Sequence, residues 1–327
     1  MAVAFGLSMP ILMKTGGQTM TFRKLFSVLL SAVFLISSMG MAAAATPETV
    51  QDKLALLEKD TYGTEQTGAV LDRLDKLEKD YDGTHRTGVS MMARVDALYD
   101  EVYTNSTKPS ILAELNALEW NVSHETSMES VESRVANMEI DLAGKTSAGT
   151  YKKRIAELSK LSFGSADLPM EAVHVPANTL VKIALVTPVN TKNIKVGDTV
   201  KYKVAADVIV DNKLVFAKGL PGEGVVTKAK PARNFGRNAE VEIDFKQTKA
   251  IDGTEVDTFI GEEAKKEMKQ LAMAAGASLA GIVILGPIGV IAGAFVNGKN
   301  IDLPAGTEVF VQTKADATLY GVVTQAK

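Results

Sequence analysis

Four cations within ten residues form the segment of this chain best suited to bind a ligand by charge. They are Lys228, Lys230, Arg233 and Arg237, and one aromatic residue, Phe235, lies among them. Cations in a loop can meet the phosphate or carboxylate groups of an anionic envelope polymer or a lipid headgroup. The competing interpretation is a solvated hairpin loop whose charges protect a sheet edge. We favour this second interpretation, because charged loops usually need no ligand.

No other set of side chains suggests catalysis. The histidines His85, His124 and His174 lie far apart in the sequence, and the chain has no cysteine. Disulfides, thiolate metal sites and cysteine nucleophiles are therefore excluded, and no carboxylate cluster has the close spacing of a metal site. We expect a protein that is not an enzyme and carries no cofactor or metal. The net charge of −3 argues against nucleic acid as a partner, and no small-molecule substrate is evident.

An apolar stretch, Leu271 to Val296, contains no charged residue. As one helix it is long enough to cross a bilayer, because about 20 residues span the hydrocarbon core. Gly286 and Pro287 interrupt it, since proline removes an amide donor and clashes with the preceding turn. The stretch is therefore either one kinked span or two helical arms that turn at these two residues. It lies either in a membrane or buried in protein.

Small residues along this stretch are spaced for close contact between the two arms, because such residues let helix backbones approach each other. The predicted seam consists of Ala272, Gly276, Ala280, Gly281, Gly289 and Gly293. Its glycines resemble the glycine-zipper segments of bacterial outer-membrane and envelope proteins. The resemblance implies a membrane or envelope component as the partner, and self-association is a further alternative.

Residues 46–166 contain six copies of a repeat of about 20 residues. Two apolar positions, three residues apart, recur in every copy: Leu54 and Leu57, Leu74 and Leu77, Val95 and Leu98, Leu115 and Leu118, Val135 and Met138, and Ile155 and Leu158. In each copy they form one stripe of a short amphipathic helix, and in four copies a turn that begins with glycine follows, at Gly63, Gly83, Gly144 and Gly164. A helix this short needs neighbours, so we expect the copies to stack, as antiparallel hairpins or as a segmented coiled coil.

The repeat consensus is L-x-x-L-E-x-x-x-Y-G-T-x-x-T-G, and residues 62–64 and 67–68 match its turn in full. It resembles the repeats of exported, largely uncharacterised bacterial cell-envelope proteins. The resemblance covers about a third of the chain and implies export and an envelope setting, not an activity. The fourth copy departs from the consensus, with Trp120, Ser123 and His124 in place of the Tyr-Gly turn.

From residue 171 to 327 the apolar period becomes two, as in strands with one buried face. Two turns share the pattern hydrophobic-Pro-Ala-x-Thr, at residues 175–179 and 303–307. They resemble turns of small β-barrel or sandwich modules in exported bacterial proteins, which is a likeness of fold alone. The sequence thus predicts an α+β protein with two domains. A helical repeat array (46–166) precedes a small β-barrel or sandwich (171–327), which carries an inserted apolar helical hairpin (262–297).

Topology favours a hairpin over a single membrane span. Strands are expected up to Ile260 and again from Asn300, and the last 28 residues or so are too few to bury a core alone. They must pair with the earlier strands, so both ends of the insertion should lie on the same side. A single span would separate them.

The first 45 residues have the pattern of a signal peptide. Arg23 and Lys24 precede an apolar core, and small residues up to Ala45 form an A-x-A cleavage site. The leader begins at Met20 or, in a longer form, at Met1. We therefore expect export to the periplasm, the outer membrane or the cell surface.

These features predict a non-enzymatic envelope protein in which a helical stalk or spacer carries a β domain that associates with a membrane or with the envelope. The alternative is a soluble extracellular binding module whose repeats recognise wall glycan or a protein partner.

Overall fold

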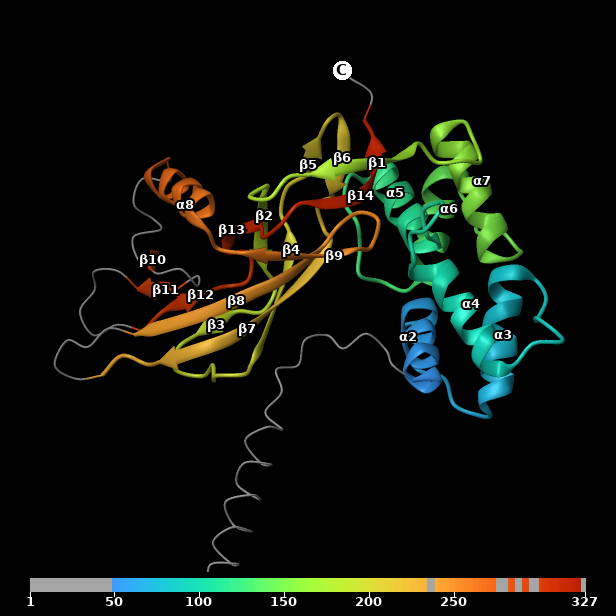
Figure 1. Cartoon of the computed structure of the whole chain (residues 1–327), viewed down its shortest axis with the longest axis horizontal. Coiled ribbons are helices and arrows are strands. Elements are labelled where there is room, and N and C mark those ends of the chain that lie inside the picture. Colours follow the sequence, from blue (N-terminus) through green and yellow to red (C-terminus); the bar gives the residue numbers. More distant parts are fainter. Residues whose placement is uncertain (1–48, 234–238, 275–281, 286–289, 294–299, 325–327) are drawn as a thin grey trace, which may run out of the picture. The chain divides into compact units, whose positions relative to one another are not determined.

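The computed structural model describes residues 49–233, 239–274, 282–285, 290–293 and 300–324 (Figure 1). The predicted leader lies outside these ranges. Residues Thr49–Lys327 form one compact unit, although the helices and the strands have largely separate hydrophobic cores. The fold is α+β, as predicted.

Six helices of 13 residues follow the six copies of the repeat. They are α2 (Val50–Tyr62), α3 (Val70–Asp82), α4 (Met91–Tyr103), α5 (Ile111–Ser123), α6 (Val131–Ala143) and α7 (Tyr151–Phe163). Five of them begin after a serine or threonine whose side chain accepts a backbone N–H of the first turn, as Thr49 does from Asp52. Four end at a glycine with positive φ, such as 84° at Gly63, a conformation that costs glycine little.

The two apolar positions of every copy are buried in one shared core, each at most 2% exposed. Helix α2 packs against α4 and α6, α3 packs against α7, and α5 contacts α4, α6 and α7. Contact between the first and fifth helices closes the array on itself. The copies therefore form a closed bundle rather than an open row of hairpins.

A buried charged pair joins consecutive copies beneath the turn between them. Glu58 accepts a hydrogen bond from Nε of Arg73 (2.8 Å) and another from the backbone N–H of Gln66 (3.0 Å). The same pairing recurs in three further places: Glu78 with Arg94, Glu119 with Arg134, and Glu139 with Arg154. Each carboxylate thus fixes the turn and the next helix together, and these partners offset the cost of removing its charge from water.

The pair is lost in a matched way between the third and fourth copies. Tyr99 stands where the glutamate belongs, and Glu114 stands where the arginine belongs. Because both positions change together, no arginine is left without its carboxylate at this junction. The fourth copy has a different task, since α5 is the helix that docks on the β region.

Asparagine side chains make the first part of that docking contact. Nδ2 of Asn116 in α5 donates to the backbone carbonyl of Ile251 (2.9 Å). Nδ2 of Asn105, before α5, donates to the carbonyl of Asp252 (2.7 Å). Both carbonyls belong to one turn of the β region, so this turn is held from two sides.

The residues that replace the Tyr-Gly turn of the fourth copy make the second part. Nε1 of Trp120 donates to Oδ2 of Asp207 (2.9 Å), and the N–H of Thr126 donates to the carbonyl of Lys218 (2.8 Å). A Cβ atom on Gly219 would lie only 2.0 Å from the carbonyl oxygen of Thr126. The departure of this copy from the consensus thus coincides with its contact with the β region.

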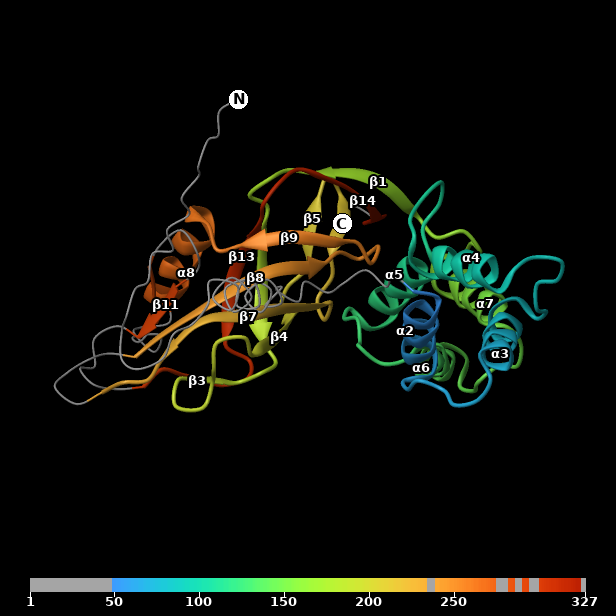
Figure 2. The same ribbon diagram turned by 60° about the horizontal axis from the view of Figure 1, so that its bottom comes forward.

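The β region begins directly after α7. Its strands are β1 (Met170–Val175), β2 (Leu180–Leu185), β3 (Val189–Asn190), β4 (Thr199–Val204), β5 (Val208–Val210), β6 (Lys213–Phe216), β7 (Pro221–Lys230), β8 (Glu240–Lys249), β9 (Glu255–Phe259), β12 (Asp302–Leu303), β13 (Glu308–Thr313) and β14 (Ala317–Val323). Six of them close an antiparallel barrel in the order β8-β7-β4-β2-β13-β9, because β9 pairs with both β13 and β8 (Figures 1 and 2). A four-stranded sheet, β1-β14-β6-β5, and the ribbon β12-β3 complete the region.

The two Pro-Ala-x-Thr turns predicted to match have the same local structure. The hydroxyls of Thr179 and Thr307 each donate to the carbonyl of the proline three residues earlier, both at 2.7 Å. Asn178 and Gly306 adopt positive φ values of 67° and 87° at equivalent places. Each turn leads into a barrel strand, β2 or β13.

The insertion differs from the expected helical hairpin. Helix α8 (Glu262–Ala274) forms its first part, but β10 (Ile282–Leu285) and β11 (Val290–Gly293) pair as antiparallel strands, and β11 lies beside β8. The described part of the second arm is therefore a strand, in keeping with the preference of isoleucine and valine for strands. No helix in the described ranges is long and apolar enough to cross a membrane.

Most of the predicted seam and turn lies outside the described residues. These positions are Gly276, Ala280, Gly281, Gly286, Pro287 and Gly289. Ala272 lies in α8 and Gly293 in β11.

Candidate functional site

The strand registers give the barrel two ends. Strand β8 runs from Glu240 to Lys249, and the turn that follows it carries Ile251 and Asp252, which bind α5 and the segment before it. We call this the docked end. The connection between β7 and β8, residues 231–239, lies at the opposite end of β8, which we call the free end.

The insertion returns to the barrel at the free end. It leaves the barrel after β9, whose last residue, Phe259, lies opposite Gln312, near the end of β13 and away from Glu308 with which that strand starts. On the returning side, Oδ1 of Asn300 accepts from the N–H of Ala232 (3.0 Å) and from the hydroxyl of Thr191 (3.3 Å). One side chain thus ties the insertion to the β7–β8 connection and to the β2–β4 connection.

The departing side of the insertion is also fixed. Oε1 of Gln312 in β13 accepts from the N–H of Ala264 in the first turn of α8 (3.1 Å). A Cβ atom on Gly261 would lie 2.4 Å from the Gln312 side chain, so no larger residue fits there unless that side chain shifts. Both flanks of the insertion are therefore held by the same barrel.

The structure divides the four predicted cations. Nζ of Lys228 pairs with Glu242 (2.8 Å) and Glu240 (3.1 Å) on the neighbouring strand, and Lys230 pairs with Glu240 (3.4 Å). Hydrogen bonds to Glu242 and Glu240 raise the pKa of Lys228. Arg233 is exposed, and Arg237 lies outside the described residues. The two lysines thus have the cross-strand role of the competing interpretation, which leaves less positive charge for an anion.

Sequence reasoning missed two further cations at the free end. Lys192 and Lys195 lie in the β2–β4 connection, and both are exposed. Val196 beside them is 63% exposed, and Val186 at the start of the same connection is 39% exposed. The pairing of β3 with β12 and the hydrogen bond between Thr191 and Asn300 bring this connection to the insertion, and contacts over more than a hundred residues leave no periodic signal in one sequence.

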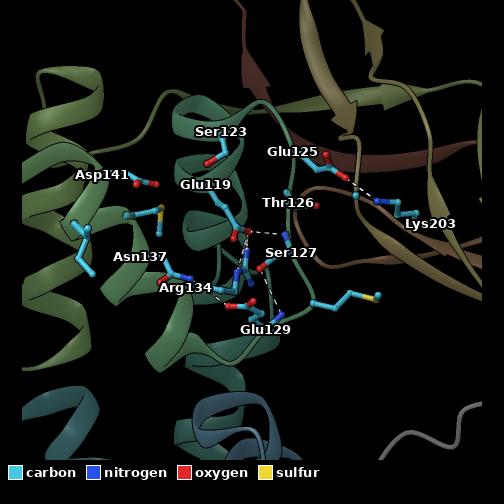
Figure 3. Close-up of a pocket in the computed structure, with 14 residues that line it drawn as sticks. Glu119, Ser123, Glu125, Thr126, Ser127, Glu129, Arg134, Asn137, Asp141 and Lys203 are labelled. Atoms are coloured by element: carbon cyan, nitrogen blue, oxygen red, sulfur yellow. Dashed lines mark hydrogen bonds and ion pairs between the residues drawn. The ribbon is translucent and has the colours of Figure 1, made fainter. Parts of the chain in front are cut away.

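A cleft of about 520 Å³ lies at the docked end, between α5, α6 and the barrel (Figure 3). Its charged groups largely bind one another: Arg134 pairs with Glu119, and Nζ of Lys203 donates to Glu125 (2.8 Å). Hydrogen bonds from Lys203 and Lys218 hold the pKa of Glu125 below its ordinary value. These bonds join the helices to the barrel, so we assign the cleft to the docking contact.

The histidines are not gathered into a site. His174 lies 3.7 Å from Asp316, and the ring of His124 lies 5.9 Å from the ring of Trp120. Across the described ranges, no group of three histidine, aspartate or glutamate side chains is arranged to hold a metal ion.

Comparison with known proteins adds little to this geometry. No family model matches the chain, and no curated protein is significantly similar to it. Among solved structures, it is similar to ComB10 of the Com type IV secretion system of Helicobacter pylori, at 13% sequence identity and a TM-score of 0.24. The similarity covers 44% of this chain and 88% of that one. A likeness at this level carries no argument about function.

Proposed function

We propose that this chain is an exported, non-enzymatic envelope protein whose barrel attaches to a membrane through the insertion. The observation that carries the proposal is that the uncharged stretch 271–296 leaves one barrel and returns to the same barrel, with both flanks fixed by hydrogen bonds. So long an apolar stretch is unfavourable in water and must be covered by protein or lipid. Export rests on the leader at residues 1–45.

In this proposal the helical array is a compact spacer. Because α2 contacts α6 and α3 contacts α7, the array forms a closed block on the docked end of the barrel, away from the insertion. The contact of the two arms along the predicted small-residue seam stays a prediction.

Cell fractionation tests the proposal. We expect the chain in the membrane fraction, released by detergent but not by high salt. A variant with residues 271–296 replaced by a Gly-Ser linker should move to the soluble fraction and keep its circular dichroism spectrum in the helical array. Sequencing of the mature N-terminus should begin at Thr46. Recovery of the unaltered chain wholly in the soluble fraction without detergent would remove the membrane function.

One observation favours a second candidate, in which the array binds a protein partner. Leu112, the second residue of α5, contacts the docked turn: a Cβ atom on Gly253 would lie 3.5 Å from it. The equivalent residues of α3 and α4, Leu71 and Met92, are 52% and 60% exposed. The same helix position is thus available in two other copies to bind a turn of another protein. A soluble chain that loses a partner on Leu71→Ser and Met92→Ser substitution would support this candidate.

A further inference from the structure

Three exposed cations lie in the two connections that bind the returning side of the insertion. Arg233 follows Ala232, which binds Asn300 at the returning side of the insertion. Lys192 follows Thr191, which binds the same Asn300. Lys195 lies in the same connection as Lys192. Within the described residues, none of these three cations has an ion-pair partner, whereas Lys228 and Lys230 do.

The carboxylates near these three cations are already engaged. Asp198 accepts from the backbone N–H of Lys195 (2.7 Å), and Asp302 accepts from the side chain of Asn190 (3.1 Å). Glu308 pairs with Lys182 (2.6 Å). Within the described residues, none of these three carboxylates forms an ion pair with Lys192, Lys195 or Arg233.

Exposed apolar side chains accompany the cations. Val196 and Val186 belong to the same connection as Lys192 and Lys195, and Asn300, on the returning flank of the uncharged stretch, is bound to this connection. A soluble anionic polymer would need the cations alone. A bilayer surface needs both features, because apolar groups enter it while cations meet its phosphates.

We propose that the free end of the barrel is a binding surface for anionic lipid headgroups, with Lys192, Lys195 and Arg233 as the headgroup-binding residues. This proposal rests on the proposed function and adds the class of lipid to it. The insertion attaches the barrel to a bilayer whatever its charge, and the three cations make the barrel prefer a negatively charged membrane.

Vesicle flotation of the purified chain tests this surface. One vesicle type contains phosphatidylcholine alone, and the other contains phosphatidylcholine mixed with phosphatidylglycerol. The test variant is Lys192→Ala/Lys195→Ala/Arg233→Ala. The matched control is Lys59→Ala/Lys145→Ala/Lys153→Ala, which removes the same charge from exposed positions of the helical array.

We expect tighter binding of the unaltered chain to the anionic vesicles, and weakening of that binding as salt is raised. The test variant should lose at least about ten-fold in partition to anionic vesicles, since each cation near such a surface contributes about five-fold. Its partition to phosphatidylcholine should stay the same, and the control variant should behave as the unaltered chain does.

Equal binding of the unaltered chain to both vesicle types would overturn the lipid assignment and leave the membrane function standing. An equal loss in the control variant would also overturn it, because net charge alone would then explain the effect. Tight binding to a soluble anionic polysaccharide without preference for anionic vesicles would assign the cations to a polymer instead. Flotation with neither vesicle type would overturn the membrane function itself.

Discussion

The helical array and the barrel are held together by different kinds of contact. In the array, each glutamate binds a turn eight residues ahead and an arginine 15 or 16 residues ahead, so a copy is fixed by its neighbours in sequence. In the barrel, Asn300 joins segments that are 68 and 109 residues away. The local contacts recur from copy to copy of the repeat. The long-range contacts of Asn300 occur once and distinguish the free end of the barrel from the docked end.

The same contrast between local and long-range contacts distinguishes the regular copies of the repeat from the fourth copy, which departs from the consensus. The consensus glutamate and arginine are kept at every junction between copies except the one before α5, and Glu119 of α5 itself pairs with Arg134. They are replaced, as a pair, where α5 enters the docking contact with the barrel. Departures from the repeat therefore mark the place where the two regions meet. Four substitutions test this interpretation.

The largest effect is expected at the core of the array. Leu77→Asp places a charge on a fully buried position and should lower the free energy of unfolding by more than about 3 kcal/mol. Leu71→Asp on the same helix is the control, because Leu71 is 52% exposed and should tolerate the change. Denaturant unfolding followed by circular dichroism measures both. Equal effects would mean that the stripe does not define the core.

The next effect concerns the buried pairs. Glu78→Gln removes the buried carboxylate that pairs with Arg94 and leaves Arg94 only the partly exposed Asp75, so it should cost about 2–4 kcal/mol. Burial raises the pKa of Glu78, but hydrogen bonds from Arg94 and Arg86 outweigh burial and hold it below the ordinary value. The stabilisation is therefore present above the unfolded-state pKa and is lost as the pH falls through the folded-state pKa.

The Glu78→Gln variant should lack this acid-dependent loss, which pH titration of the melting temperature measures. Glu132→Gln, at an exposed position of α6, is the control and should leave the pH profile unchanged. If Glu78→Gln retained the full acid dependence, other carboxylates would be responsible for it.

A smaller effect is expected at the docking contact. Gly219→Ala introduces a Cβ atom 2.0 Å from the carbonyl oxygen of Thr126, whereas Gly197→Ala meets nothing within 4 Å. Both glycines have a φ near 95°, at 96° and 94°, so backbone strain is shared and only the clash differs. We expect Gly219→Ala to cost about 1–3 kcal/mol more than Gly197→Ala. Gly219→Ala should also make the array and the barrel unfold in two separate thermal transitions. Identical thermograms would show that Gly219 does not form the contact.

The smallest effect is expected for the ion pairs beside Gly219. Glu125 is 34% exposed and pairs with Lys203 and Lys218, so Glu125→Gln should cost at most about 1 kcal/mol. Hydrogen bonds from these lysines lower the pKa of Glu125, so its contribution is lost as the pH falls through that lowered value. Glu132→Gln, exposed on α6, is the control in the same melting experiment. A cost well above this size would mean that solvent screens the pair less than its exposure indicates.

The array was predictable from sequence because its contacts are periodic. Leu54, Leu57 and their equivalents are buried as the spacing indicated, and Gly63 and Gly83 end their helices. The pairing of Glu58 with Arg73 was not predicted, because periodicity shows that two positions recur but not that they touch.

The sequence predicted the fold class of the β region, but it did not predict which side chains come together at the free end. Alternation at Val200 and Tyr202 indicated strands, yet it does not specify which strands pair. The sequence therefore did not predict that Asn300 joins the connections that carry Lys192 and Arg233. It also did not predict that Lys228 pairs with Glu242. The expected helical hairpin was wrong for the segment around Ile284, since an apolar run without polar residues has no period that separates helix from strand.

We propose that the two ends of the barrel differ, with the helical array on the docked end and a membrane on the free end. Because the chain contains no cysteine, a single dye can be placed at Val196→Cys at the free end or at Met92→Cys in the array, positions that are 63% and 60% exposed. We predict that anionic vesicles shift the emission of the dye to the blue only at Val196→Cys, and that a lipid-borne quencher reduces emission only there. Equal responses at both positions, or a response at Met92→Cys alone, would contradict the account.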